Sequence, residues 1–175
     1  TGDYNPAMLK QAVQESHVVG DVVEHYLRIA PGKLGITFAT DVETATQIAA
    51  RFNSSGVSAE VVSAKTPDST RVAIIEQFRN RKIMQLVNVD LFGEGFDLPA
   101  VEVVSMARPT QSYSLFCQQF GRALRIMKGK DVAIIIDHAN NVIRHGLPDK
   151  SREWTMDSVV GTPRAKNPDD DIPMR

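Results

Sequence analysis

The sequence is poor in cysteine, and Cys117 is the only one among 175 residues. This scarcity excludes a disulfide within the chain and a zinc site built from several cysteines, and it fits a reducing, cytoplasmic setting. Because Cys117 lies next to Phe116 and close to Phe120, we interpret it as a packing residue rather than a nucleophile. The histidines show no close ligand spacing, so no metal site is predicted.

An excess of one charge and a long apolar run are also missing. Lysine and arginine number 20 against 21 aspartates and glutamates, so any contact with nucleic acid must rely on local basic patches. No run approaches the length of a transmembrane helix and no signal peptide is recognised, so no membrane partner is expected. The chain starts at Thr1 without methionine, and we expect it to be part of a longer polypeptide.

Short apolar runs alternate with amphipathic segments along the chain. The runs predict strands at residues 34–39, 59–62, 83–89, 101–106 and 132–137. Because most of them are apolar on both faces, we predict a three-layer α/β domain, a parallel sheet with helices on both faces. It should span residues 32–150, between an N-terminal helical segment (1–31) and a tail or linker (151–175).

Several local signals set the expected helix boundaries. Thr40 or Asp41 should cap one helix and Gly56 should end it. The N-terminal helical pattern should break near Gly20. The helix that follows Thr66-Pro67-Asp68 should turn Val72, Ile75 and Phe78 inward, and a later helix should run from Ser112 to Leu124.

Residues 118–125 read Q-x-x-G-R-x-x-R. On a helix, Gln118, Arg122 and Arg125 fall at positions i, i+4 and i+7 and share one face. The opposite face would carry Phe116, Phe120 and Leu124. Two guanidinium groups on a rigid element suit the neutralisation of a phosphoryl group in transfer, including one held by another domain. A solvated helix face is the alternative interpretation.

A glycine-containing segment follows the third predicted strand directly, at residues 88–99. Ligands gather at the carboxyl ends of parallel strands. Gly93 and Gly95 allow tight turns and close approach of a phosphate or ribose, and Asp97 could accept a hydrogen bond from a ribose hydroxyl. The alternative is a surface loop that needs two glycines.

The order and spacing of these segments resemble the second RecA-like lobe of a superfamily 2 helicase or translocase. Residues 34–40, 88–99 and 118–125 are similar to motifs IV, V and VI, and the likeness covers roughly residues 33–137. A closer resemblance, to RadD-like and phage-type DEAD/DEAH-box helicases and to restriction-enzyme motor subunits, rests on short segments at residues 87–89, 94–97, 107–110, 121–125, 137–141 and 160–163.

The resemblance implies ATP with Mg²⁺, bound between this lobe and a first lobe of the same polypeptide. Arg125 would be the arginine finger on the γ-phosphate, Arg122 its neighbour, and Gln118 would couple the nucleotide to the lobe interface. The nucleotide side of the cleft would be lined by Glu94, Gly95 and Asp97.

Nucleic acid, with DNA favoured by the resemblance, should cross the top of both lobes. It would contact the hydroxyl and helix N-terminus at Thr40 and Asp41 and the backbone near Asn88 and Val89. Many relatives have threonine where Val89 stands, so a hydroxyl contact is lost there. Other basic residues are interpreted as solvated surface charge: Arg71, Arg79, Arg81, Lys82, Lys128 and Lys130.

The sequence contains neither G-x-x-x-x-G-K-[ST] nor D-E-x-H, the segments that cradle phosphates and hold magnesium. We therefore expect this chain alone to be inactive as an ATPase, with the Mg²⁺ ligands in the first lobe. The full-length protein is expected to be an ATP-dependent helicase. A duplex translocase motor of a restriction or repair complex and a non-catalytic binding lobe remain as alternatives.

Overall fold

The computed structural model describes residues 3–5, 18–90, 101–126 and 128–150. Within them, five strands form one parallel sheet in the order β2-β3-β1-β4-β5. The strands are β1 (Gly35–Phe38), β2 (Ala59–Ser63), β3 (Gln85–Val89), β4 (Val103–Met106) and β5 (Ile134–Asp137). The predicted parallel sheet is confirmed, although most strands are shorter than their apolar runs.

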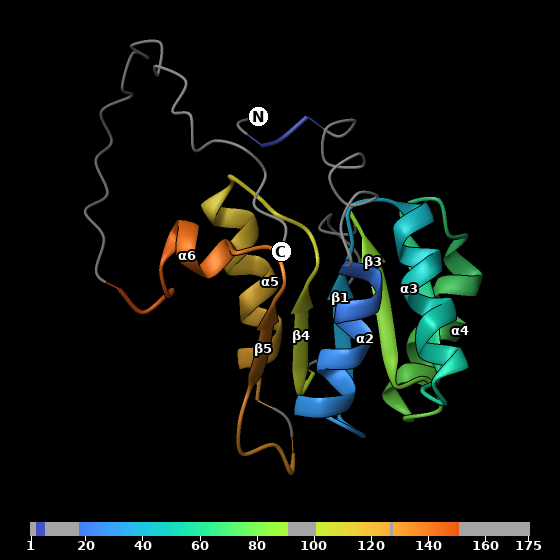
Figure 1. The fold of residues 1–175 in the computed structure, drawn as a ribbon. Coiled ribbons are helices and arrows are strands. Elements are labelled where there is room, and N and C mark those ends of the chain that lie inside the picture. The colour runs from blue at the N-terminus through green and yellow to red at the C-terminus, as the bar shows by residue number, and fades with distance from the viewer. Residues whose placement is uncertain (1–2, 6–17, 91–100, 127, 151–175) are drawn as a thin grey trace.

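Helices cover both faces of this sheet (Figure 1). They are α2 (Val18–Ile29), α3 (Val42–Ser54), α4 (Asp68–Arg79), α5 (Tyr113–Leu124) and the short α6 (Asn141–His145). One core cluster joins α2 and α3 to one face of the sheet, through residues such as Tyr26, Phe52 and Val87. A second cluster joins α4 and α5 to the other face, through Phe78 and Phe116.

The three central strands are buried along their whole length, whereas the edge strands β2 and β5 are only partly buried. Successive residues of β3 alternate between the two clusters, with Leu86 in one and Val87 in the other. This alternation follows from the two-residue period of a strand, and it explains why the central strands are apolar on both faces.

Two predicted helix boundaries are confirmed. Asp41 is the N-cap of α3, and its carboxylate accepts a hydrogen bond from the Thr44 backbone N–H at 3.0 Å. The chain reverses just after α3 at Gly56, where φ is +80°, a left-handed conformation that favours glycine.

Two local predictions met a different local structure. Gly20 itself does not interrupt the described helix α2, because Val18, Val22 and Tyr26 all pack into the core, and the residues just before Val18, where the predicted break would otherwise fall, lie outside the described residues. On α4, Val72 is 67% exposed, while Ile74 takes the buried position beside Ile75 and Phe78. In both places tertiary packing outweighed a local signal.

Helix α2 is part of the same core as the sheet, since Val22 and Tyr26 are fully buried against α3 and the strands. The division at residue 31 therefore stays a prediction about the chain's connections, and the tail at 151–175 lies outside the described residues. Nowhere in the described part of the chain is there a helix with the length and apolar character needed to span a bilayer.

Candidate functional site

All five strands end at the same edge of the sheet, which we call the carboxyl edge; the opposite one is the amino edge. In Figure 1 the carboxyl edge lies at the top, where residues 3–5 also lie and where α2, α3 and α5 begin. The segments after β1, β3 and β4 therefore come together, and with them several of the predicted site residues.

Thr40 and Asp41 follow β1 at this edge, and their side chains are hydrogen-bonded to each other. The Thr40 hydroxyl donates to Asp41 Oδ2 at 2.8 Å, and the Thr44 hydroxyl donates to the same oxygen at 2.8 Å. Burial alone would raise the pKa of Asp41, but the hydrogen bonds from Thr44 and Thr40 outweigh burial and hold that pKa below its usual value. A phosphate contact by Thr40 would have to compete with this carboxylate.

Asn88 and Val89 end the neighbouring strand β3. The backbone carbonyl of Asn88 accepts a hydrogen bond from Ala39 N–H at 3.0 Å, so the two predicted nucleic-acid segments do lie side by side. The side chains of Asn88 and Val89 are 1% and 5% exposed. Within the described residues, neither polar atom of the Asn88 amide has a hydrogen-bond partner. Their contact with nucleic acid stays a prediction.

Of the three predicted phosphate-binding residues, Gln118 and Arg122 lie on helix α5 and Arg125 does not. Gln118 is exposed and Arg122 is partly exposed on α5, whereas Arg125 lies just past its end with φ −60° and ψ 138°. The predicted i, i+4, i+7 face was therefore wrong at Arg125. Leu124, predicted on the apolar face, is 58% exposed. The glutamine that α5 buries is Gln119, the neighbour of Gln118.

A lysine fixes the end of α5. Lys130 Nζ donates to the carbonyl oxygens of Ala123 at 2.6 Å and Val101 at 3.1 Å, and also to that of Arg125. A cation at these carbonyls stabilises a helix C-terminus. Because Val101 precedes β4, the Arg125 backbone lies toward the amino edge, away from Thr40 and Asn88. The surface-charge interpretation of Lys130 was wrong.

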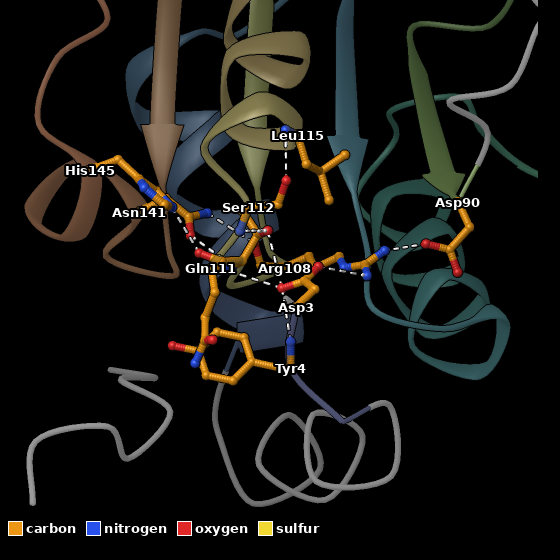
Figure 2. Close-up of polar contacts among 10 residues, drawn as sticks. Asp3, Tyr4, Asp90, Arg108, Gln111, Ser112, Leu115, Asn141 and His145 are labelled. Atoms are coloured by element: carbon orange, nitrogen blue, oxygen red, sulfur yellow. Dashed lines mark hydrogen bonds and ion pairs between the residues drawn. The ribbon is translucent and has the colours of Figure 1, made fainter. Parts of the chain in front are cut away.

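The residues around the start of α5 form a network that sequence reasoning missed (Figure 2). We call residues 107–112 the β4–α5 loop. The backbone N–H of Thr110 donates to Asn141 Oδ1 at 3.0 Å, and the carbonyl of Thr110 lies 2.8 Å from His145 Nε2. Asn141 Nδ2 also donates to the Arg108 carbonyl at 2.9 Å. Side chains from α6 thus hold the loop.

Arg108 connects this loop to two other segments. Its guanidinium forms ion pairs with Asp90, which directly follows β3, and with Asp3, at 3.3 Å through Nη2. The Arg108 side chain is 14% exposed. Asp90 has φ +52°, an uncommon conformation for a residue other than glycine. The A-R-P-T segment at residues 107–110 was the available signal, but nothing local identified its partners.

A histidine pair lies near the carboxyl edge, where His138 follows β5. Its Nδ1 is 3.4 Å from Nδ1 of His25 on α2, with the rings 10° apart. Burial, together with the charge of His25, lowers the pKa of His138 to about 4, although Asp21 opposes the shift. His138 is therefore neutral near pH 7, and the contact between the two rings joins α2 to the end of β5.

The remaining predicted nucleotide residues, Glu94, Gly95 and Asp97, lie outside the described residues. In the described ranges, no three side chains of histidine, cysteine, aspartate or glutamate gather closely enough to hold a metal ion.

This five-stranded parallel sheet with helices on both faces is a RecA-like α/β lobe. The helicase conserved C-terminal domain family matches residues 18–127, and the chain belongs to that family. It is the C-terminal lobe of a superfamily 2 helicase, as the motif order predicted.

Named relatives are longer than this chain. A 51.5 kDa protein of a Lactococcus phage is 41% identical over 87% of this chain, which covers 33% of that protein. The "Putative ATP-dependent helicase IRC3" of Saccharomyces cerevisiae is 33% identical over 60% of this chain and 15% of its own length. The C-terminal domain of the DEAD-box protein Dbp5 shares the fold, with a TM-score of 0.60 and 20% identity over 73% of each chain.

Proposed function

We propose that this chain is the part of an ATP-dependent helicase or translocase that supplies Arg122 and Arg125 to ATP held by a first lobe. The observation that carries the proposal is the geometry of α5. Its inner side is fixed in the core by Phe116 and Ala123, while Gln118 and Arg122 lie on its accessible side. A rigid helix can present a guanidinium without reorganisation when charge develops on a phosphate.

Gly121 supports the approach of a first lobe or a nucleotide to this helix. A Cβ atom added there would meet nothing within 4 Å, so packing of this lobe does not require glycine. Glycine in a helix interior costs about 0.5–1 kcal/mol relative to alanine. Close approach of a first lobe or of a nucleotide would explain a glycine at this position. An open hollow of about 540 Å³, lined by Tyr113, Ser114, Cys117 and Gln118, lies on the same helix.

The described residues fit one part of Mg²⁺-ATP. Arg122 and Arg125 suit its phosphate oxygens, since guanidinium groups bind them with paired hydrogen bonds. Ligands for the metal would come from the first lobe, because the sequence contains neither G-x-x-x-x-G-K-[ST] nor D-E-x-H, the segments that cradle phosphates and hold magnesium. Bound there, ATP supplies a transferable γ-phosphoryl group, and the part of this chain is to orient and neutralise it.

Nucleic acid would cross the carboxyl edge, where the segments after β1 and β3 meet. We propose that the Thr40 hydroxyl, the helix N-terminus at Asp41 and the backbone near Asn88 and Val89 contact phosphates rather than bases. Such contacts position the strand but carry no sequence information. DNA is the proposed substrate because of the sequence resemblance to RadD-like and phage-type helicases and to restriction-enzyme motor subunits.

The test uses the full-length polypeptide and its ATP turnover with single-stranded DNA, duplex DNA and RNA. We expect Arg125→Ala and Arg122→Ala to lower stimulated turnover by about 10³-fold or more while ATP still binds. Arg28→Ala is the matched control, because Arg28 lies in the last turn of α2 and is exposed. Turnover like the wild type in both variants would overturn the arginine assignment.

The nucleic-acid arms of that test address the substrate and the kind of motor. Stimulation by RNA alone would overturn the choice of DNA. Strand displacement and triplex displacement, measured side by side, distinguish a helicase from a translocase. Unwinding of a plain duplex supports a helicase, and triplex displacement without unwinding supports a translocase.

A further inference from the structure

Asp3 lies more than a hundred residues before α5, yet its side chain contacts the loop that leads into that helix (Figure 2). Asp3 Oδ1 accepts hydrogen bonds from Gln111 N–H at 2.9 Å, from the Thr110 hydroxyl at 3.2 Å and from Tyr4 N–H at 2.9 Å. Asp3 Oδ2 faces Arg108 Nη2 at 3.3 Å. One carboxylate thus contacts three residues of the β4–α5 loop.

These contacts continue into α5. The Thr110 hydroxyl, which donates to Asp3, accepts a hydrogen bond from Ser112 N–H at 3.0 Å. Ser112 is the N-cap of α5, and its hydroxyl accepts from Leu115 N–H at 3.3 Å. Two hydroxyl groups therefore separate the carboxylate of Asp3 from the first turn of the helix that carries Gln118 and Arg122.

The other anchors of the loop belong to the folded lobe itself. Asn141 and His145 bind Thr110 from α6, and Asp90 binds Arg108 from the end of β3. Asp3 differs from them because it belongs to the segment before α2, which we expect to connect from the first lobe. Its side chain is 20% exposed. A movement of residues 3–5 would release this anchor while Asn141, His145 and Asp90 stay in place.

We propose that Asp3 is a positioning residue for the arginines of α5. With its carboxylate docked, the β4–α5 loop and the start of α5 are held where Arg122 meets the nucleotide. When Asp3 leaves the loop, Gln111 N–H loses its acceptor and Arg108 loses one of its two carboxylate partners. The entry of the chain into this lobe is thereby coupled to the arginine helix. This inference rests on the proposed function.

The experiment compares Asp3→Ala and Asp3→Asn in the full-length protein, with nucleic-acid-stimulated ATP turnover as the readout. We expect Asp3→Ala to lower kcat about tenfold with little change in KM, because the contacts act on a group that binds the transition state. Asp3→Asn keeps an oxygen acceptor for Gln111 N–H and the Thr110 hydroxyl, so it should recover most of the loss. Asp68→Ala is the control, since its exposed carboxylate also pairs with an arginine, Arg71.

Three outcomes would overturn the inference: wild-type kcat in Asp3→Ala, a parallel fall of kcat and melting temperature, or no recovery in Asp3→Asn. The double variant Asp3→Ala/Arg122→Ala adds a second check. If Asp3 acts through Arg122, the double variant turns over like Arg122→Ala alone; an additive loss contradicts this. If Arg122→Ala and Arg125→Ala both turn over like the wild type, the proposed function fails. If those variants lose turnover but Asp3→Ala does not, only the positioning role of Asp3 fails.

Discussion

The two edges of the sheet differ in how their charged and polar side chains are paired. At the amino edge, Glu102 is 7% exposed and accepts hydrogen bonds from Leu34 N–H at 2.9 Å, Lys33 Nζ at 3.2 Å and Arg81 Nη2 at 2.9 Å. At the carboxyl edge, the Asn88 amide and Nε of Arg108 have no hydrogen-bond partner among the described residues. The carboxylate of Glu102 is thus satisfied within the lobe, although Oε1 of Gln85 at the same edge has no partner among the described residues, whereas at the carboxyl edge both polar atoms of the Asn88 amide lack one.

Arg81 is exposed, as its interpretation as a surface charge predicted, with 47% of its side chain accessible. The sequence did not predict that its guanidinium also forms an ion pair with Glu102. Burial would raise the pKa of Glu102, but the hydrogen bonds from Leu34, Arg81 and Lys33 outweigh it and lower that pKa. A buried carboxylate with three donors is typical of a structural site.

The largest expected effect on stability is at the amino edge. Glu102→Ala leaves Leu34 N–H without its acceptor and separates Lys33 and Arg81 from their shared partner. We expect a loss of about 3 kcal/mol in the free energy of unfolding, measured by denaturant titration. Glu102→Gln keeps one acceptor and should lose less. A stability unchanged in Glu102→Ala would contradict the structural role of this edge.

Acid should weaken the two edges in different pH windows. The pKa of His138 is lowered to about 4, so its neutral form is favoured in the fold, and stability falls as pH drops from about 6.5 to about 4. The pKa of Glu102 is also lowered, but its contribution is lost only below about pH 4.5. We expect roughly 1–3 kcal/mol from His138.

Unfolding measured across pH checks both windows. His138→Gln should remove the loss between pH 6.5 and 4 and leave the loss at lower pH. Glu102→Gln should do the reverse. If both variants retain the full profile of the wild type, neither group is responsible for the acid sensitivity.

At the carboxyl edge, a substitution should stabilise the lobe and impair the motor. Asn88→Leu removes two buried polar atoms that lack partners and keeps the same number and branching of heavy atoms, so we expect a gain of about 1 kcal/mol in unfolding free energy. Nucleic-acid stimulation of the full-length ATPase should fall. Ser105→Ala is the control, because its hydroxyl is also buried without a partner. Unchanged stimulation in Asn88→Leu would show that this amide serves no outside partner.

The smallest expected effect compares two helix glycines that have open space around them. A Cβ atom would meet nothing within 4 Å at either Gly20 or Gly121. Each change to alanine should therefore raise stability by about 0.5–1 kcal/mol. Turnover of the full-length protein should fall in Gly121→Ala and stay constant in Gly20→Ala. Equal turnover in both variants would argue against the approach of a first lobe or a nucleotide to α5 at Gly121.

The predictable features are those with a local cause. Apolar runs placed all five strands, because a strand covered on both faces must be apolar along its length. The oxygen of Asp41 placed the start of α3, since capping acts within three residues. The order of the short motifs placed the chain in its family, which residues 18–127 confirm.

Other features had no local signal. Arg125 was expected to extend the face of Gln118 and Arg122, but α5 ends at Leu124, where Lys130 binds the last carbonyl groups. Val72 fitted the helical period as well as Ile74 did, and only packing against the sheet separated them.

The sequence by itself determined the layers, the strand direction and the identity of the phosphate-binding candidates, because patterns of two and about four residues fix which side of an element is apolar. Only the tertiary structure decided which distant residues meet. Asp3 reaches Thr110 and Arg108, and Glu102 reaches Lys33 and Arg81, across stretches of chain that no local pattern connects. Such contacts form because folding brings polar groups to the same edge, where each needs a partner once it leaves water.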